Sequence, residues 1–370
     1  MNRVSVKVIS YLMAGVLLSL AWSLRGQFGH LKGAMIPGMF VGLRVLLRTP
    51  ASLHENSNRV FLIPALAVLG FSLGGHMSYG RLFEQMLKAQ QAVEILLPAI
   101  KIFGTGFLWG GLGMSLLGWA LQEKPFSRFD FVHLSILIFS WVILLGILNL
   151  ESWDRTLFTA SFISIHLINL IFNKSKNILF FGVFGALGFG LAFLFSGLLL
   201  SLGSHGVFGS CPWWQLRDQI IGFLGGIMLE LACQRKAKSE NQTVPGPTTS
   251  GARPKQVLGL MALFYGVAIP NAFNVSYHWQ AAGGVSKIIW LGTAFISLIY
   301  FGSVLMLWKL VKGNEKAVTF TALSLVFYLG FLAIAKETVV YGWQRWEPGF
   351  TLIVIYAFLL SFLGLKRLKA

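Results

Sequence analysis

The chain has 370 residues, of which 55% are hydrophobic and 12% are charged, and its mean hydropathy is +0.71. A typical soluble domain has about 25% charged residues, so this composition excludes a soluble enzyme, a disordered chain and a small disulfide-bonded secreted module. The net charge of +17 fits either nucleic-acid binding or the cytoplasmic excess of Lys and Arg in a membrane protein. Because no stretch forms a soluble basic module, we predict that the chain partners a lipid bilayer and binds no nucleic acid.

Apolar runs of about 20 residues, the length that a helix needs to cross a bilayer, recur along the whole chain. The first run follows a basic N-terminus, as in a signal peptide, but we interpret it as a retained helix because a later helix repeats its end. The predicted fold class is an all-α polytopic membrane protein with about twelve transmembrane helices. The predicted crossings lie near residues 4–24, 34–48, 60–79, 98–121, 131–150, 156–173, 179–202, 216–233, 256–273, 286–308, 317–335 and 349–365.

The distribution of positive charge predicts how these helices are oriented. With a cytoplasmic N-terminus and alternating crossings, 20 of the 30 Lys and Arg residues fall on the cytoplasmic side, among them Arg44. Such an excess is typical of cytoplasmic loops. We therefore predict that both termini are cytoplasmic and that the membrane is a bacterial cytoplasmic (inner) membrane.

One segment, residues 234–255, is basic at first and then rich in Pro, Gly, Ser and Thr. This composition is typical of a flexible linker. It divides the chain into residues 1–233, which contain predicted helices one to eight, and residues 256–370, which contain helices nine to twelve.

The two six-helix halves, about 1–175 and 176–370, share short matches in the same order. These pair Gly26-x-Phe28-Gly29 with Gly206-x-Phe208-Gly209, Ser78-Tyr79 with Ser276-Tyr277, and Glu151 with Glu337. Six helices per half predict a parallel repeat about an axis along the membrane normal. The alternative is that membrane sequences rich in glycine and aromatic residues give such matches by chance.

Most of the unusual polar residues lie at the predicted outer ends of helices. Ionisable groups at membrane depth are costly and usually belong to partners or to a pathway, so the sequence predicts a polar vestibule that opens outward. Its segments are residues 25–33, 74–84, 149–155, 204–218, 270–280 and 336–348.

Arg25 is the first candidate in this vestibule, because it begins a glycine-rich break between two helices where a guanidinium could hold an anion. The alternative is an interfacial charge that extends toward water. Trp and Tyr side chains nearby could stack on a ring, or could form the aromatic belt of the membrane interface. The predicted substrate-binding residues are Arg25, Gln27, His30, Tyr79, Arg217, Tyr277, His278 and Trp343.

Glu151 and Glu337 are the predicted proton- or ion-coupling residues, and the alternative is that they form structural pairs with Arg155 and Lys336. Asp218 at the start of a helix is explained by the helix dipole. No histidines have the i, i+4 spacing of a helical metal pair and no HExxH motif occurs. We therefore predict no metal and no cofactor.

These features together predict a transporter for a small polar solute, for example a sugar or sugar acid. The alternative is a membrane-embedded enzyme that acts on a lipid-linked or cell-envelope substrate at the outer leaflet, with acid–base groups drawn from Glu151, Glu337, His30 and His205. A carrier needs polar residues at mid-depth, and few are predicted there. These few include His166, Asn169 and Ser72.

Overall fold

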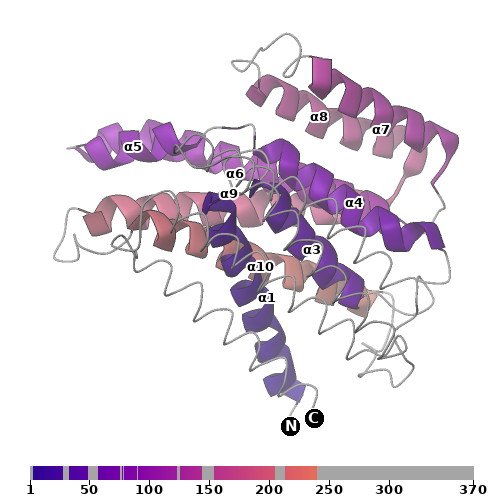
Figure 1. The fold of residues 1–370 in the computed structure, drawn as a ribbon, viewed down its shortest axis with the longest axis horizontal. Helices are drawn as coiled ribbons and strands as arrows, with labels where there is room; N and C mark the ends of the chain where they lie inside the picture. The colour runs from indigo at the N-terminus through magenta and orange to yellow at the C-terminus, as the bar shows by residue number, and fades with distance from the viewer. Residues whose placement is uncertain are drawn as a thin grey trace, which may run out of the picture.

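The computed structural model describes the helices of the first 239 residues, and these are packed side by side (Figure 1). Every secondary-structure element in the described residues is helical. The last four predicted crossings and most of the predicted linker lie outside these residues, as does the second half of the predicted repeat from residue 240 onward. The described residues are 3–27, 33–48, 57–75, 77, 79–89, 91–122, 126–143, 154–204 and 213–239.

The helices correspond in order to the first eight predicted crossings, with one short helix in addition. Helix α10 ends at Ser239, so its last six residues, 234–239, lie within the predicted linker. The elements are α1 (Arg3–Gln27), α3 (Met35–Arg48), α4 (Ser57–Gly74), α5 (Gly80–Lys88), α6 (Ala92–Ala120), α7 (Arg128–Trp141), α8 (Asp154–Ile168), the π-helix η4 (Asn169–Asn173), α9 (Lys176–Ser204) and α10 (Trp213–Ser239).

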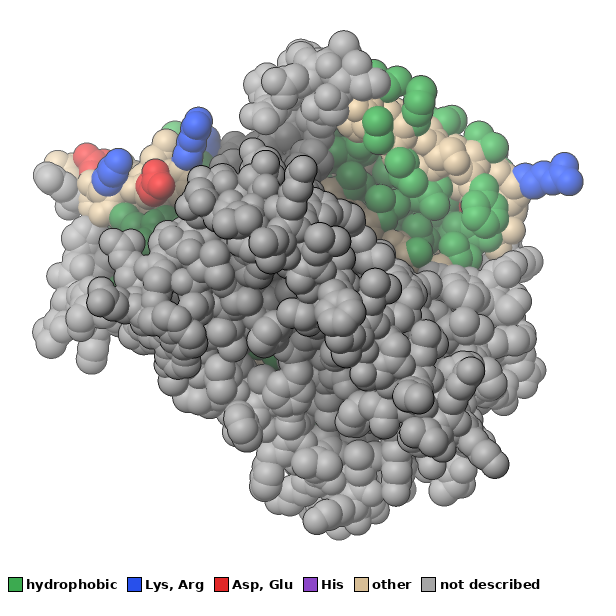
Figure 2. Space-filling view, in the orientation of Figure 1, with side chains coloured by type: hydrophobic (Ala, Val, Ile, Leu, Met, Phe, Trp, Pro, Cys, Tyr) green, Lys and Arg blue, Asp and Glu red, His purple; other side chains and the backbone are tan. Residues whose placement is uncertain are grey.

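Three described helices are long and apolar enough to cross a membrane: Lys7–Gly26, Val93–Ala120 and Lys176–Gly203. Helix α9 exposes apolar side chains at intervals of four residues, from Leu179 to Phe195, so one whole face of this helix is hydrophobic. Hydrophobic side chains also cover the visible face of α7 and α8 (Figure 2). Such surfaces are compatible with contact to lipid and with a polytopic membrane protein.

Glycines bring the long helices into close contact. Gly110 of α6 and Gly185 of α9 face each other so closely that a Cβ on either would overlap the carbonyl oxygen of the other. Gly222 and Gly226 of α10 approach the backbone of α1 in the same way. Small residues allow this approach between membrane helices.

Helices α4 and α5 form one interrupted helix. Along α9, successive contacts join Tyr79 to Phe193 and Phe83 to Gly197, so α5 runs in the same direction as α9. Helix α4 is antiparallel to α6, and α6 is antiparallel to α9, so α4 also runs in this direction. In Figure 1, α5 and α4 accordingly lie toward opposite ends of α6. The interruption lies between Gly74, where α4 ends, and Gly80, where α5 begins.

The interruption has a local physical cause. The Gly75 N–H donates to Ser72 O instead of continuing the helix, which leaves the carbonyl of Phe71 without its helical donor. Trp109 of α6 supplies that donor, because its Nε1–H bonds to Phe71 O at 2.9 Å. Gly74 makes room for the indole, since a Cβ there would overlap the Trp109 ring.

This arrangement corrects two predicted boundaries. The sequence predicts that residues 74–84 form an outer segment between crossings 60–79 and 98–121. Instead, the helix resumes at Gly80, and α6 already begins at Ala92, where Gln91 and Glu94 form a capping box. The glycine- and serine-rich run looks like a surface loop in the sequence, but Gly74 and Tyr79 at its two ends both pack against Trp109 near the middle of α6.

Candidate functional site

Three segments far apart in the sequence meet beside the interruption. Arg25 comes from the last turn of α1, Tyr79 precedes the first residue of α5, and Arg217 and Asp218 come from the start of α10. All four are buried, with exposed fractions of 3%, 2%, 7% and 6%, respectively. We call these four residues the Arg25 cluster. It brings together two cations, one anion and a phenol in the interior of an apolar bundle.

Tyr79 fixes the position of Arg25. The Arg25 Nη1–H donates a hydrogen bond to the Tyr79 hydroxyl oxygen. The Arg25 guanidinium carbon lies 4.9 Å from the centre of the Tyr79 ring and 4.8 Å from that of Trp109. Tyr79 itself packs against Trp109 and Phe193, which lie near the middle of α6 and α9. Aromatic faces attract a guanidinium, and more strongly where water is excluded.

Arg25 nevertheless has N–H groups that donate to no acceptor among the described residues. Its Nε and Nη2 atoms are buried and have no hydrogen-bond partner in the described part of the chain. Neither of the ion pairs found among the described residues includes Arg25. A buried cation without a counter-ion is costly, so this side chain can accept an anion.

Arg217, by contrast, carries its own counter-ion. Its Nε and Nη2 atoms donate to Asp218 Oδ1 at 2.9 and 2.7 Å. The Arg217 guanidinium carbon lies 5.2 Å from the Tyr79 ring and 4.7 Å from the Phe83 ring. Because the pair is neutral, the Arg25 cluster has a single uncompensated positive charge. Asp218 therefore balances Arg217 directly. The predicted explanation by the helix dipole is wrong, because α10 begins at Trp213 and has no acidic residue in its first turn.

The structure brings together three of the predicted substrate-binding residues, namely Arg25, Tyr79 and Arg217. Gln27 is the last residue of α1, and its side chain lies outside the description. The remaining predicted site residues also lie outside the described residues. These are His30, Glu151, His205, Tyr277, His278, Glu337 and Trp343.

Sequence reasoning missed the aromatic wall of the Arg25 cluster. Trp22 and Trp109 are fully buried, and their ring centres lie 5.2 Å apart. Both sit inside predicted crossings, where a tryptophan resembles any other apolar residue. Gln219, next to Asp218, also has a buried side-chain nitrogen without a hydrogen-bond partner in the part of the chain that the structure describes. In the sequence, the one feature that could have identified Gln219 is its position inside an otherwise apolar predicted crossing.

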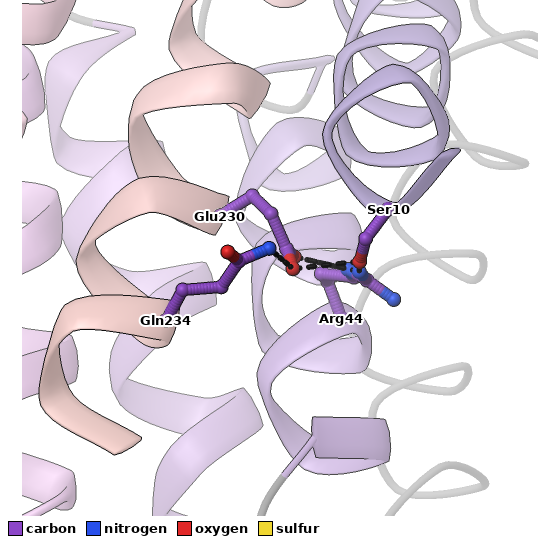
Figure 3. A network of polar contacts seen from close by, with 4 residues as sticks. All are labelled: Ser10, Arg44, Glu230 and Gln234. Atoms are coloured by element: carbon purple, nitrogen blue, oxygen red, sulfur yellow. Dashed lines mark hydrogen bonds and ion pairs between the residues drawn. The ribbon is translucent and has the colours of Figure 1, made fainter. Parts of the chain in front are cut away.

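A second polar cluster, also missed, joins α1, α3 and α10 (Figure 3). Arg44 donates through Nε and Nη2 to Glu230 Oε2 at 3.0 and 2.6 Å. Ser10 and Gln234 donate to the other carboxylate oxygen, Oε1, at 2.7 and 3.0 Å. Glu230 is fully buried and Arg44 is 4% exposed. Both oxygens of Glu230 therefore have partners, and we call these four residues the Glu230 cluster.

The Glu230 cluster corrects the place predicted for Arg44. The sequence analysis counts Arg44 among the charges of cytoplasmic loops, but the residue lies within α3 and points into the bundle. A buried carboxylate on a neighbouring helix holds it there, because an isolated charge in that position would be strongly unfavourable. The available signal was a glutamate inside the predicted crossing 216–233.

The polar residues predicted at mid-depth contact backbone groups or side chains of the helices. Ser72 Oγ donates to Leu69 O, and the Asn169 side chain bonds to the backbone of Ser175. His166 Nε2 lies 3.1 Å from Ser115 Oγ. Among the described residues, no group of three or more His, Cys, Asp or Glu side chains could hold a metal ion.

The Arg25 cluster is thus the arrangement in the described residues that is best suited to bind a ligand. Its chemistry is that of an anion receptor with aromatic walls, since it combines a buried guanidinium with two indoles and a phenol. Comparison with protein-family models, with curated proteins and with solved structures gives no match to this chain.

Proposed function

We propose that this chain is a membrane transporter for a small polar solute that bears a negative charge, for example a sugar acid. The observation that carries the proposal is the buried guanidinium of Arg25, which has two donors without partners among the described residues and lies against Trp109 near the middle of α6. Ionisable residues inside membrane bundles mark substrate or ion pathways by default.

The interrupted helix α4–α5 supports the same proposal. Non-helical backbone at membrane depth is tolerated where it is buried in protein or lines a cavity, and interrupted helices in transporters form substrate sites. Tyr79 sits at the end of this interruption and holds Arg25. Helix α5, which follows, buries Leu82 and Phe83 and exposes Arg81 and Glu84. Charged side chains accordingly gather over α5 (Figure 2).

The alternative function, an enzyme at the outer leaflet, depends on acid–base groups at Glu151, Glu337, His30 or His205. The described residues of the Arg25 cluster offer cations and aromatic rings, which bind and orient an anion. They offer no histidine–carboxylate pair, so the described geometry favours binding over acid–base chemistry. The coupling roles of Glu151 and Glu337 stay predictions.

Exchange measurements in proteoliposomes test the proposal. Solutes first come from a thermal-shift screen of sugars, sugar acids, amino acids and nucleosides with the purified full-length protein, in which a bound ligand raises the unfolding temperature. We expect a radiolabelled hit to exchange across the membrane in the wild type. Arg25→Gln should reduce this exchange at least tenfold because it removes the buried charge.

Arg81→Gln is the matched control, because it makes the same change on the exposed face of α5 and should leave exchange intact. Wild-type exchange by Arg25→Gln would contradict the proposal. Binding of the solute without any exchange would favour the enzyme alternative instead.

A further inference from the structure

The described region contains three buried arginines. They differ in the hydrogen-bond partner of one edge of the guanidinium, the edge formed by Nε and Nη2. Arg44 holds the Glu230 carboxylate on the edge formed by Nε and Nη2. Arg217 holds the Asp218 carboxylate on the same edge. Arg25 uses only Nη1, toward Tyr79, and its Nε and Nη2 have no partner in the described residues. In Arg44 and Arg217, the group bound to this edge is therefore a carboxylate.

The geometry of that edge selects the kind of anion. The Nε–H and one Nη2–H of a guanidinium point in parallel, about one carboxylate width apart, so a planar carboxylate can accept both at once. The guanidinium of Arg25 is also held in orientation, because Tyr79 binds Nη1 and the Trp109 ring lies against it. A pre-oriented donor pair loses little entropy on binding.

The charge of the cluster selects the number of charges on the ligand. Arg217 and Asp218 neutralise each other, so Arg25 provides one unit of positive charge. A monoanion cancels that charge, whereas a phosphate dianion would leave one negative charge buried without compensation. A neutral solute would leave Arg25 itself uncompensated.

We propose that the Nε/Nη2 edge of Arg25 binds the carboxylate of a monocarboxylate solute, with the Trp109 and Tyr79 rings flanking the ion pair. The inference rests on the proposed function, for which it names the substrate class. It excludes phosphate esters and neutral sugars as the preferred substrates.

The test compares ligands that share one ring and differ in the polar group. Binding to the purified full-length protein is measured by calorimetry and thermal shift with D-glucuronate, D-glucose and D-glucose 6-phosphate. Acetate, lactate and benzoate cover other carboxylate shapes. We expect one or more carboxylates to bind at millimolar or lower concentration and at least tenfold more tightly than the neutral and phosphorylated probes.

A variant that keeps the charge tests the edge itself. Arg25→Lys retains a cation but cannot offer two parallel N–H groups, so we expect the affinity for the best carboxylate to fall about tenfold or more. Arg81→Lys makes the same change at an exposed site on α5 and should leave the affinity unchanged. If Arg25→Lys does not fold, the comparison of probes on the wild type still decides the inference.

Three results would overturn the inference: no binding of any carboxylate, equal or tighter binding of glucose, or tighter binding of glucose 6-phosphate. Its failure is distinguishable from that of the transporter proposal. Carboxylate binding without exchange in proteoliposomes would leave the carboxylate site standing and reject transport. Exchange of a neutral sugar that does not depend on Arg25 would show transport, but it would reject both the carboxylate site and the negative charge proposed for the solute.

Discussion

Two buried arginines of this protein, Arg25 and Arg44, are stabilised by different kinds of partner. Each lies among apolar helices and is less than one-twentieth exposed. Arg44 is neutralised by Glu230, while Arg25 is stabilised by aromatic faces and one phenol. The charge of Arg44 is therefore satisfied within the bundle, whereas that of Arg25 has no carboxylate partner among the described residues.

The energetic role of the Glu230 cluster leads to a prediction at the residue scale. Glu230→Leu leaves the guanidinium of Arg44 buried without its carboxylate, and removal of one partner of such a pair costs about 3–5 kcal/mol of stability. The double variant Arg44→Met/Glu230→Leu removes both charges and should recover most of that loss. Unfolding midpoints in detergent measure both effects, and a double variant no more stable than the single one would contradict this account.

At the scale of the elements, glycine contacts set the distance between α6 and α9. A Cβ on Gly185 would overlap the carbonyl oxygen of Gly110, so Gly185→Ala must push the helices apart. We expect a loss of about 1–3 kcal/mol, the usual cost of overpacking. Thermal unfolding of the purified protein measures this loss.

Gly104 is the matched control on α6, because nothing lies within 4 Å of its Cβ position. Gly104→Ala should leave stability unchanged or raise it by up to about 1 kcal/mol, since alanine favours the helix over glycine. Equal losses for Gly104→Ala and Gly185→Ala would show that helix contact is not the cause.

The interrupted helix α4–α5 yields a second prediction at this scale. Trp109→Phe keeps an aromatic ring against Tyr79 but removes the N–H that bonds to Phe71 O. A buried carbonyl left without a donor costs about 1–3 kcal/mol. We therefore expect a lower unfolding temperature together with weaker carboxylate binding, because the interruption positions Tyr79 and, through it, Arg25. Unchanged binding would show that the indole N–H does not position the site.

For the molecule as a whole, the sequence predicted the positions of helices better than it predicted which helices and side chains contact one another. Hydropathy located eight of the described helices, three of which are long and apolar enough to cross a membrane, because such helices need long apolar runs whatever their neighbours. Polarity at the helix ends identified Arg25, Tyr79 and Arg217, since a charge beside an apolar run is unusual. That the three residues would meet was not predictable in detail, because the meeting depends on how α1, α5 and α10 cross.

The residues that sequence reasoning missed share a physical reason. Arg44 and Glu230 lie in different helices, 186 positions apart, and only packing reveals that each compensates the other. Trp109 acts through a single N–H toward a carbonyl that becomes free because a different helix ends at Gly74. Local composition carries no information about such tertiary pairings.

Helices α1 and α10 each contribute to both clusters: Ser10 and Arg25 lie on α1, and Glu230 and Arg217 on α10. On α1, the two positions are fifteen residues apart, which is about 22 Å of helix. Between them, Gly222 and Gly226 of α10 contact the backbone of α1, and the Phe223 ring of α10 packs against Gly15 of α1. Because the same two helices carry both clusters, any change in the angle between α1 and α10 would alter the Ser10–Glu230 contact at one end together with the surroundings of Arg25 at the other.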